Sequence, residues 1–167
     1  MPDPALPNAP LAPELSVDAW LNTRAPLSLG ALRGQVVVLH FFQMLCPGCV
    51  THAVPQTDKL FRKVREPGLT VLGLHSVFEH HAVMTPDALR VFAHEFRLGF
   101  PIGIDAHDDD DPIPRTLRAY GLQGTPSTVL VGADGRIRLQ ALGPVDDLAL
   151  GVAIGQALAE RATPRAA

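Results

Sequence analysis

The stretch FFQMLCPGCVTHAVP, residues 41–55, joins the end of an apolar run to a segment with helical character. The run QVVVLHFF (Gln35–Phe42) is continuously apolar and rich in β-branched residues, which is typical of a strand buried on both faces. A helix is expected from about Pro47 to Arg65, with a kink near Pro55 because proline removes a helix hydrogen bond. The two cysteines of this stretch therefore fall where the strand gives way to the helix.

These cysteines, Cys46 and Cys49, are three positions apart on the predicted first turn, so their sulfur atoms can come within disulfide reach. A helix N-terminus carries partial positive charge and unpaired N–H groups, and both favour a thiolate over a thiol at Cys46. Disulfides in reducing compartments are usually transient and catalytic. We expect Cys46 to attack a substrate disulfide as the exposed nucleophile, and the more buried Cys49 to resolve the mixed disulfide.

Two other interpretations of the cysteines remain open. Free cysteine is often a plain core residue, so both thiols could be inert parts of the interior. Cys46, Cys49 and His52 also form a C-x2-C-x2-H pattern, which His40 or His75 could complete as a zinc site. No second Cys/His pair stands at the usual distance in the sequence, and we expect no metal and no other cofactor.

A second motif, Gly124-Thr125-Pro126-Ser127, directly precedes the predicted strand STVLV. Proline cannot donate to a β-ladder, and it is easier to accommodate before a central strand if a cis peptide bond makes a sharp turn there. The local Gly-Thr-Pro-Ser-strand context favours a cis Thr125–Pro126 bond that faces the cysteines, with the backbone of Thr125 free to pair with an extended substrate. An ordinary trans proline that ends a loop is the alternative, because most X–Pro bonds are trans. The predicted substrate-contacting residues are Pro47, Gly48, Thr125 and Pro126.

The remaining hydrophobic patterns alternate between strands and helices. The further expected elements are a helical turn at Val17–Asn22, strands at Pro26–Leu29, Leu69–Val77, Phe100–Asp105, Ser127–Val131 and Arg136–Leu142, and helices at about Thr85–Arg97, Pro114–Tyr120 and Val145–Arg161. This order predicts an α/β fold with a central mixed β-sheet flanked by helices on both faces. We expect an extended N-terminal arm (1–16), a single domain (17–161) and a loose tail (162–167).

Composition and charge exclude several classes of protein. The 167 residues are 47% hydrophobic and 19% charged, which fits one folded domain without disulfide or metal staples. A net charge of -3 argues against a nucleic-acid or anionic-membrane surface. No apolar run is long enough to span a bilayer, and the proline-rich start, without Lys or Arg, is unlike a secretory signal. We expect a cytoplasmic protein, or a periplasmic one if a leader has been lost.

The loop after the second buried strand carries four titratable side chains: His75, Glu79, His80 and His81. If this strand is parallel to the first, both carboxyl ends lie at the same sheet edge, where open α/β sheets place their sites. A carboxylate in a partly apolar site can pass a proton to the departing Cys49, so Glu79 is the predicted proton carrier. His80 or His81 could instead tune the thiolate, and an ordinary solvated loop is the remaining alternative.

Together, the strand, the Cys-Pro-Gly-Cys motif, the helix with an internal proline and the run GTPSTVLVGADGRI resemble the thioredoxin superfamily. The likeness covers about Pro26 to Leu142 and is closest to the TlpA/ResA-like and AhpC/TSA-type redoxin branch. The resemblance implies a thioredoxin fold, thiol–disulfide exchange, a nucleophilic Cys46, a resolving Cys49 and a cis Pro126. Similar redoxins also carry a glutamate after the second core strand, which corresponds to Glu79.

The sequence departs from the family pattern in three places. Pro55 lies six residues after Cys49, where relatives usually have five, and Leu45 replaces the usual aromatic residue before the first cysteine. The pair between the cysteines is Pro-Gly, which differs from the Gly-Pro of thioredoxins and the Pro-His of strong periplasmic oxidants. These departures leave the reduction potential open.

The leading functional hypothesis is a thiol–disulfide oxidoreductase that acts on protein or small-molecule disulfides with an unidentified electron donor, without a nucleic-acid or membrane partner. A peroxiredoxin-type thiol peroxidase is the alternative enzyme. Peroxiredoxins have a P-x-x-x-T-x-x-C pattern, and neither cysteine has the Thr and Pro in register, although Arg115 or Arg118 could supply the arginine. A third hypothesis is a redox-sensing module that changes its affinity for a partner without turnover.

Overall fold

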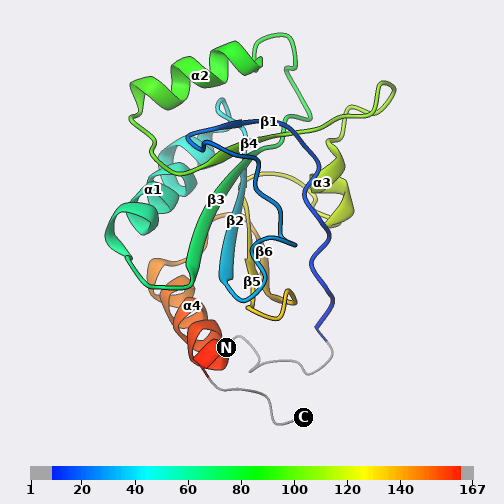
Figure 1. Cartoon of the computed structure of the whole chain (residues 1–167). Helices are drawn as coiled ribbons and strands as arrows, with labels where there is room; N and C mark the ends of the chain where they lie inside the picture. The colour runs from blue at the N-terminus through cyan, green and yellow to red at the C-terminus, as the bar shows by residue number, and fades with distance from the viewer. Residues whose placement is uncertain (1–8, 163–167) are drawn as a thin grey trace.

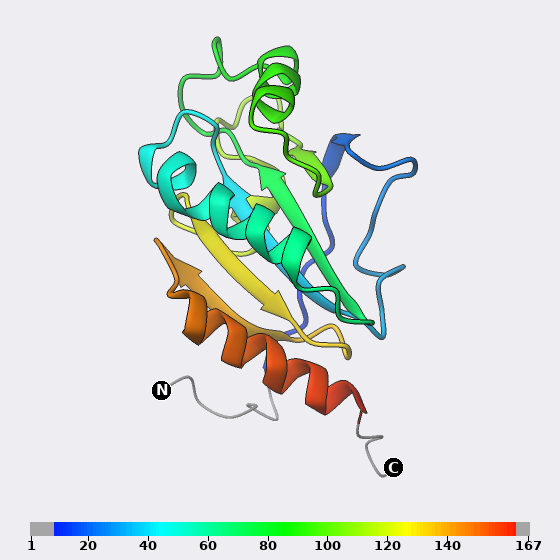
Figure 2. The same ribbon diagram turned by 90° about the vertical axis from the view of Figure 1, so that its left-hand side faces the viewer.

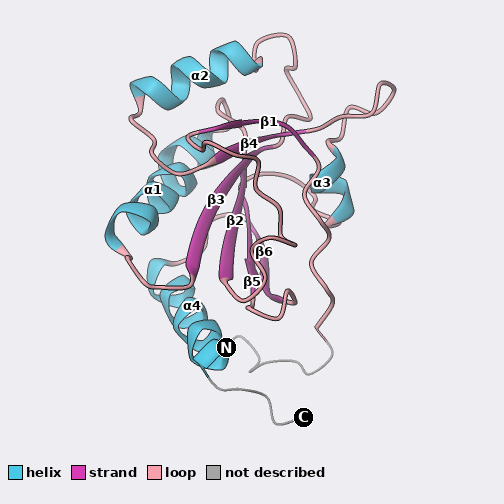
Figure 3. Cartoon of the chain, viewed as in Figure 1, coloured by secondary structure: helices cyan, strands magenta, loops and turns pink. Residues whose placement is uncertain are grey.

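The computed structural model describes residues 9–162, and within them a mixed β-sheet of strand order β1-β4-β3-β2-β5-β6 forms the centre of the fold (Figure 3). The strands are β1 (Val17–Leu21), β2 (Val36–Phe42), β3 (Leu69–His75), β4 (Ile102–Asp105), β5 (Ser127–Val131) and β6 (Ile137–Leu142). The helices are η1 (Cys49–Ala53, a π-helical turn), α1 (Val54–Lys63), α2 (Pro86–Glu95), α3 (Arg115–Ala119) and α4 (Asp147–Ala162). The expected α/β class with a mixed sheet is confirmed.

Helices cover both faces of the sheet because all seven residues of β2, apolar except for His40, are buried. Val37, Leu39 and Phe41 face a core completed by Leu117 of α3. The alternate residues Val36 and Val38 face α1 and α4, which lie side by side across the other face (Figure 2). Helix α2 lies over the end of the sheet that carries β4 (Figure 1).

Two expected elements near the N-terminus are wrong. Val17–Asn22 is not a helical turn, because Val17–Leu21 forms β1 and pairs antiparallel with β4. Pro26–Leu29 is a loop that leads into a turn and not a strand. In the described part of the predicted arm, Leu11 bridges to Arg136 beside β6, while residues 1–8 lie outside the described chain.

The ends of three strands meet at one edge of the sheet. β2 and β3 are parallel and end together, with Phe42 paired to His75. β5 is antiparallel to β2 and therefore begins at the same edge, with Ser127 paired to Phe41. The segment with the two cysteines, the loop after β3 and the segment before β5 consequently come together at this edge.

Candidate active site

Cys46 lies in the loop between β2 and η1, and Cys49 is the first residue of η1. The Cys46 side chain is partly exposed and its thiol donates to the carbonyl oxygen of Thr125 at 3.5 Å. The Cys49 side chain has no exposed surface and hydrogen-bonds the Cys46 side chain. Burial, together with that hydrogen bond, raises the pKa of the Cys49 thiol to about 12. The two thiols are adjacent but differ strongly in access to solvent.

The helix that carries Cys49 contains a wide π turn in its first turns, which the sequence did not predict. Pro47 and Gly48 are α-helical, and the amide of Val50 donates to the carbonyl of Cys46 at 3.0 Å. The amide of Val54 then donates to the carbonyl of Cys49, five residues back, and α1 continues from there. Pro55 follows at the start of α1, where its missing N–H interrupts the usual i→i−4 ladder. Single π turns of this kind are frequent at functional sites. The irregularity of the helix that was expected near Pro55 is thus present as a π turn, whose hydrogen bond ends at Val54, one residue before the proline.

The Thr125–Pro126 peptide bond is cis, as the motif predicted. Pro126 is buried against Gly48, whose hypothetical Cβ would lie 3.4 Å from the proline Cδ. The residue between the cysteines is therefore packed directly on the cis proline. The structure brings Cys46, Gly48, Thr125 and Pro126 together, while Pro47 is exposed beside them.

Gln43 is a site residue that the sequence reasoning missed. Its side chain is buried, its amide nitrogen lies 3.4 Å from the Thr125 hydroxyl oxygen, to which it donates, and its carbonyl accepts from the amide of Phe78 at 3.1 Å. The main-chain carbonyl of Gln43 also accepts from the amide of Cys46 at 3.1 Å. One side chain thus ties the proline loop to the loop after β3. The sequence does contain a signal for this residue, because Gln43 is a polar residue directly after the apolar strand segment that ends at Phe42.

Two buried histidines lie close to the cysteine segment. His75, at the end of β3, accepts from the amide of Met44 through Nε2 at 3.2 Å, and burial lowers its pKa to about 4. His40, on β2, lies 3.3 Å from the Thr128 hydroxyl through Nδ1, while its buried Nε2 has no hydrogen-bond partner. Burial, with the nearby charge of His52, lowers the pKa of His40 to about 4. Both imidazoles are therefore neutral near neutral pH.

The expected surroundings of Glu79 are not those found. Glu79 is exposed in the bend after β3, so its carboxylate does not lie in a partly apolar pocket. His80 is also exposed, with a positive φ of 52°, and His81 is exposed with Nε2 3.2 Å from the carbonyl oxygen of Pro112. None of the three has a hydrogen bond to Cys46 or Cys49 among the contacts of residues 9–162.

The structure does not assemble the zinc alternative. Within residues 9–162, no three His, Cys, Asp or Glu side chains are grouped closely enough to hold a metal ion. His52 is exposed and its Nε2 lies 3.4 Å from the carbonyl oxygen of Val145.

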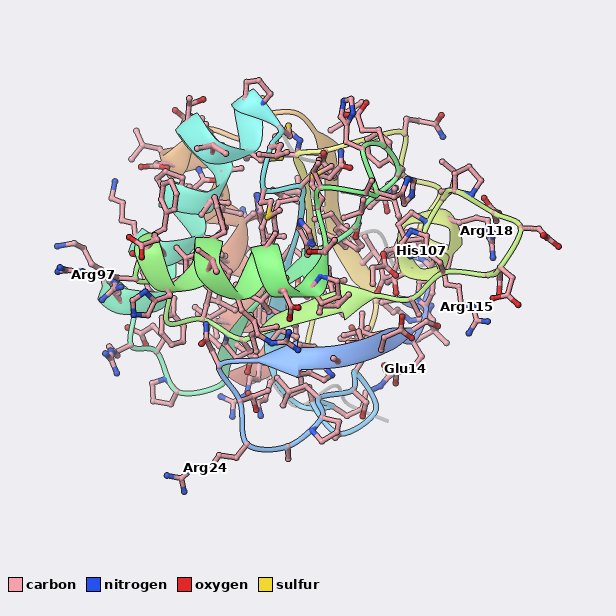
Figure 4. The ribbon with its side chains drawn as sticks, turned by 90° about the horizontal axis from the view of Figure 1, so that it is seen from above. Glu14, Arg24, Arg97, His107, Arg115 and Arg118 are labelled. Carbon is pink, nitrogen blue, oxygen red and sulfur yellow. The ribbon has the colours of Figure 1, made fainter. Side chains whose placement is uncertain are left out.

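The two arginines considered for a peroxidase site lie at one end of the molecule near His107 (Figure 4). Arg115 forms an ion pair with Asp108, and Arg118 forms ion pairs with Asp108 and Asp111. Both guanidinium groups are therefore already engaged by carboxylates of the acidic loop.

Comparison with known proteins identifies the family. The sequence model described as the AhpC/TSA family matches residues 10–140. The chain belongs to this family. It superimposes with a TM-score of 0.86 on a thiol-disulfide isomerase from Corynebacterium glutamicum at 52% identity, covering 92% of this chain and 98% of that one. A thioredoxin-like superfamily protein gives 0.84 at 45% identity, covering 89% and 96% of the two chains.

Among curated relatives, the thiol:disulfide interchange protein DsbE of Allochromatium vinosum is 30% identical over 136 residues, which are 81% of this chain and 66% of DsbE. The chain spans only 18% of the length of the mycobacterial proteins named DipZ, with which it is 28% identical. The expected redoxin of the thioredoxin superfamily, with its thioredoxin-like fold, is confirmed.

Proposed function

We propose that this chain is a thiol–disulfide oxidoreductase that uses Cys46 and Cys49 as its dithiol. One observation carries the proposal: a partly exposed Cys46 thiol lies against the Thr125 carbonyl beside cis Pro126, with a buried Cys49 thiol directly behind it. An approaching disulfide can reach Cys46 and not Cys49. The related proteins named as a thiol-disulfide isomerase and a thiol:disulfide interchange protein support the same chemistry.

The reaction proceeds in two exchanges. The Cys46 thiolate attacks one sulfur of a substrate disulfide, so that a mixed disulfide forms and the other substrate sulfur leaves as a thiolate. Cys49 then loses its proton and attacks the Cys46 sulfur, which releases the second substrate thiol and leaves a Cys46–Cys49 disulfide. Two electrons pass to the substrate, and an external dithiol returns them to the enzyme. The substrates are protein or small-molecule disulfides.

Glu79 remains the proposed carrier of the Cys49 proton. Its exposed place in the loop that Gln43 ties to the active-site segment supports a role in exchanging protons with solvent. Glu79→Gln is expected to shift the pH profile of disulfide reduction, whereas Glu95→Gln, an exposed glutamate on α2, is expected to leave it unchanged. Identical profiles for both variants would remove Glu79 from the mechanism.

The test of the function is reduction of insulin disulfides with dithiothreitol as the electron source. The wild type is expected to turn over many times, Cys46→Ser to be inactive, and Cys49→Ser to stop after one mixed disulfide per molecule. Faster turnover with hydrogen peroxide than with any disulfide would favour the peroxidase alternative, which the family match supports. Binding that changes with oxidation state without turnover would favour a sensor.

No helix within residues 9–162 is long and apolar enough to cross a membrane. Location in the cytoplasm, or in the periplasm if a leader precedes the sequence, stays a prediction. Fractionation of cells that make the full-length natural gene product would decide between the two.

A further inference from the structure

The Cys49 sulfur is buried, so its thiolate depends on groups inside the site for stabilisation. Burial and the Cys46 thiol raise the pKa of Cys49, whereas hydrogen bonds from the Gln43 main chain and the Thr125 side chain lower it. A hydrogen bond that favours a thiolate is one that is donated to the sulfur, so the Thr125 hydroxyl presents its O–H to Cys49. Whatever orients that hydroxyl therefore affects the exchange made by Cys49.

The orientation of the Thr125 hydroxyl follows from the side-chain amide of Gln43, which is 1% exposed. The Gln43 carbonyl oxygen accepts from the main-chain amide of Phe78 at 3.1 Å, and a main-chain N–H can only donate. The other end of the Gln43 amide, Nε2, therefore faces the Thr125 hydroxyl oxygen, 3.4 Å away, and this nitrogen can also only donate. The Phe78 amide thus decides which way the Gln43 amide is turned.

A hydroxyl that accepts a hydrogen bond keeps its own single hydrogen for another partner. Thr125 accepts from Gln43, and the Cys49 sulfur is the acceptor that its hydroxyl meets. The donors therefore run in one direction, from the Phe78 amide through Gln43 and Thr125 to the sulfur. Hydrogen bonds in such a chain strengthen one another in a low-dielectric interior, so the chain stabilises a thiolate better than the hydroxyl alone.

We propose that Gln43 is a positioning residue for the second exchange: it holds the Thr125 hydroxyl as a donor to the Cys49 sulfur and so stabilises the thiolate that attacks the mixed disulfide. The inference rests on the proposed function, because it concerns the step in which Cys49 releases the substrate. The first exchange is independent of it, since the Cys46 thiol contacts the main-chain carbonyl of Thr125, which no side-chain substitution removes.

The two exchanges can be separated by mixing reduced protein with an equal amount of dithiobis(nitrobenzoate), an aromatic disulfide. The Cys46 thiolate breaks the S–S bond of the reagent and releases one coloured thionitrobenzoate. The Cys49 thiolate then attacks the Cys46 sulfur and releases the second. The reagent gains two electrons, the protein becomes the Cys46–Cys49 disulfide, and the two thiol protons pass to the buffer.

The wild type is expected to release two thionitrobenzoates per molecule in two phases. Gln43→Met keeps the length of the side chain but has no N–H, and it is expected to slow the second phase about tenfold while leaving the first within about twofold. Gln56→Met is the matched control, because Gln56 is a buried glutamine on α1 whose amide donates to the Val145 carbonyl and to Asp147. This control is expected to keep both phases at the wild-type rates.

A role through the Thr125 hydroxyl leaves a signature that a general loosening of the site does not. Thr125→Val, which lacks the hydroxyl, should slow the second phase as Gln43→Met does, whereas Thr125→Ser, which keeps it, should retain a fast second phase. Adding Gln43→Met to Thr125→Val should slow the second phase no further, because the group through which Gln43 acts is already absent.

If Gln43→Met does not fold, Gln43→Glu still offers an acceptor to the Phe78 amide. It also offers an acceptor to the Thr125 hydroxyl, which then turns away from Cys49, so the second phase should again be slow. A second phase at the wild-type rate in a folded Gln43 variant, or additive losses in the double variant, would overturn the positioning role and leave the proposed function standing. A wild type that forms no Cys46–Cys49 disulfide with the reagent would overturn the proposed function itself.

Discussion

The difference in burial between the two cysteines predicts a large difference in their chemistry. The pKa of Cys49 is raised to about 12 from the ordinary 9.0, and only the thiolate reacts with alkylating agents. At about pH 8 the thiolate fraction of Cys49 is then roughly a thousandfold below that of an ordinary cysteine. Cys46→Ser leaves Cys49 as the sole thiol and keeps its burial, the largest cause of the raised pKa, but removes the contribution of the Cys46 thiol. Iodoacetamide should therefore react with this variant at least about tenfold more slowly than with an unstructured cysteine peptide.

The assay follows alkylation by mass spectrometry over a range of pH. The rate for Cys49 should keep rising about tenfold per pH unit to above pH 10, because the thiol has not yet titrated there. In denaturant the same variant should react like the peptide, which controls for an oxidised or damaged thiol. A native rate within tenfold of the peptide, or a plateau near pH 9, would refute the assignment of Cys49 as the buried resolving thiol.

Three further predictions concern stability and packing. Burial lowers the pKa values of His40 and His75 to about 4 in the folded protein, compared with 6.5 in the unfolded chain. The contribution of these neutral histidines to the free energy of unfolding is therefore fully present above about pH 6.5 and is lost as the pH falls towards 4. Urea unfolding should show a loss of about 2 kcal/mol per histidine between pH 7 and 5, and a total loss below about 1 kcal/mol would contradict this. Gly48→Ala should keep most disulfide-reductase activity, because the added Cβ would lie 3.4 Å from the Cδ atom of Pro126, an ordinary contact distance. Gly48→Leu should lower kcat/KM at least about tenfold, because the larger side chain has no room against the proline. Equal activities of the two variants would argue against this packing. Asp105→Ala should cost about 3 kcal/mol in chemical unfolding, because the buried carboxylate accepts hydrogen bonds from Ser76 and from two amides of α3, and a cost below about 1 kcal/mol would show that those donors find other partners.

Much of the site could be read from local patterns. An apolar run broken only by His40 must be covered on both faces, which placed β2 at the centre of the sheet. Proline before a strand indicated the cis bond, and the spacing of Cys46 and Cys49 indicated adjacent thiols. Each of these features depends on a few neighbouring residues, so one sequence contains the whole signal.

Features that depend on distant partners were missed. Val17–Leu21 has the composition of a helical turn and becomes a strand only because β4 offers it an edge to pair with. Gln43 gains its role from Thr125 and Phe78, which are far from it in sequence. Glu79 was expected in a partly apolar site because its strand ends at the cysteines, but its side chain is exposed to solvent. The hydrophobic periodicity of a strand does not indicate where the loop that follows it will lie.

The central claim is that Cys46 and Cys49 form one reversible two-electron redox pair. Equilibrating the protein in glutathione buffers of graded potential, followed by alkylation and mass spectrometry of each cysteine, tests this claim directly. We predict that both thiols disappear together in a single transition, with a midpoint between about -270 and -120 mV, and that an intramolecular Cys46–Cys49 disulfide replaces them. Independent oxidation of the two cysteines, or no intramolecular disulfide at any potential, would contradict the proposed function.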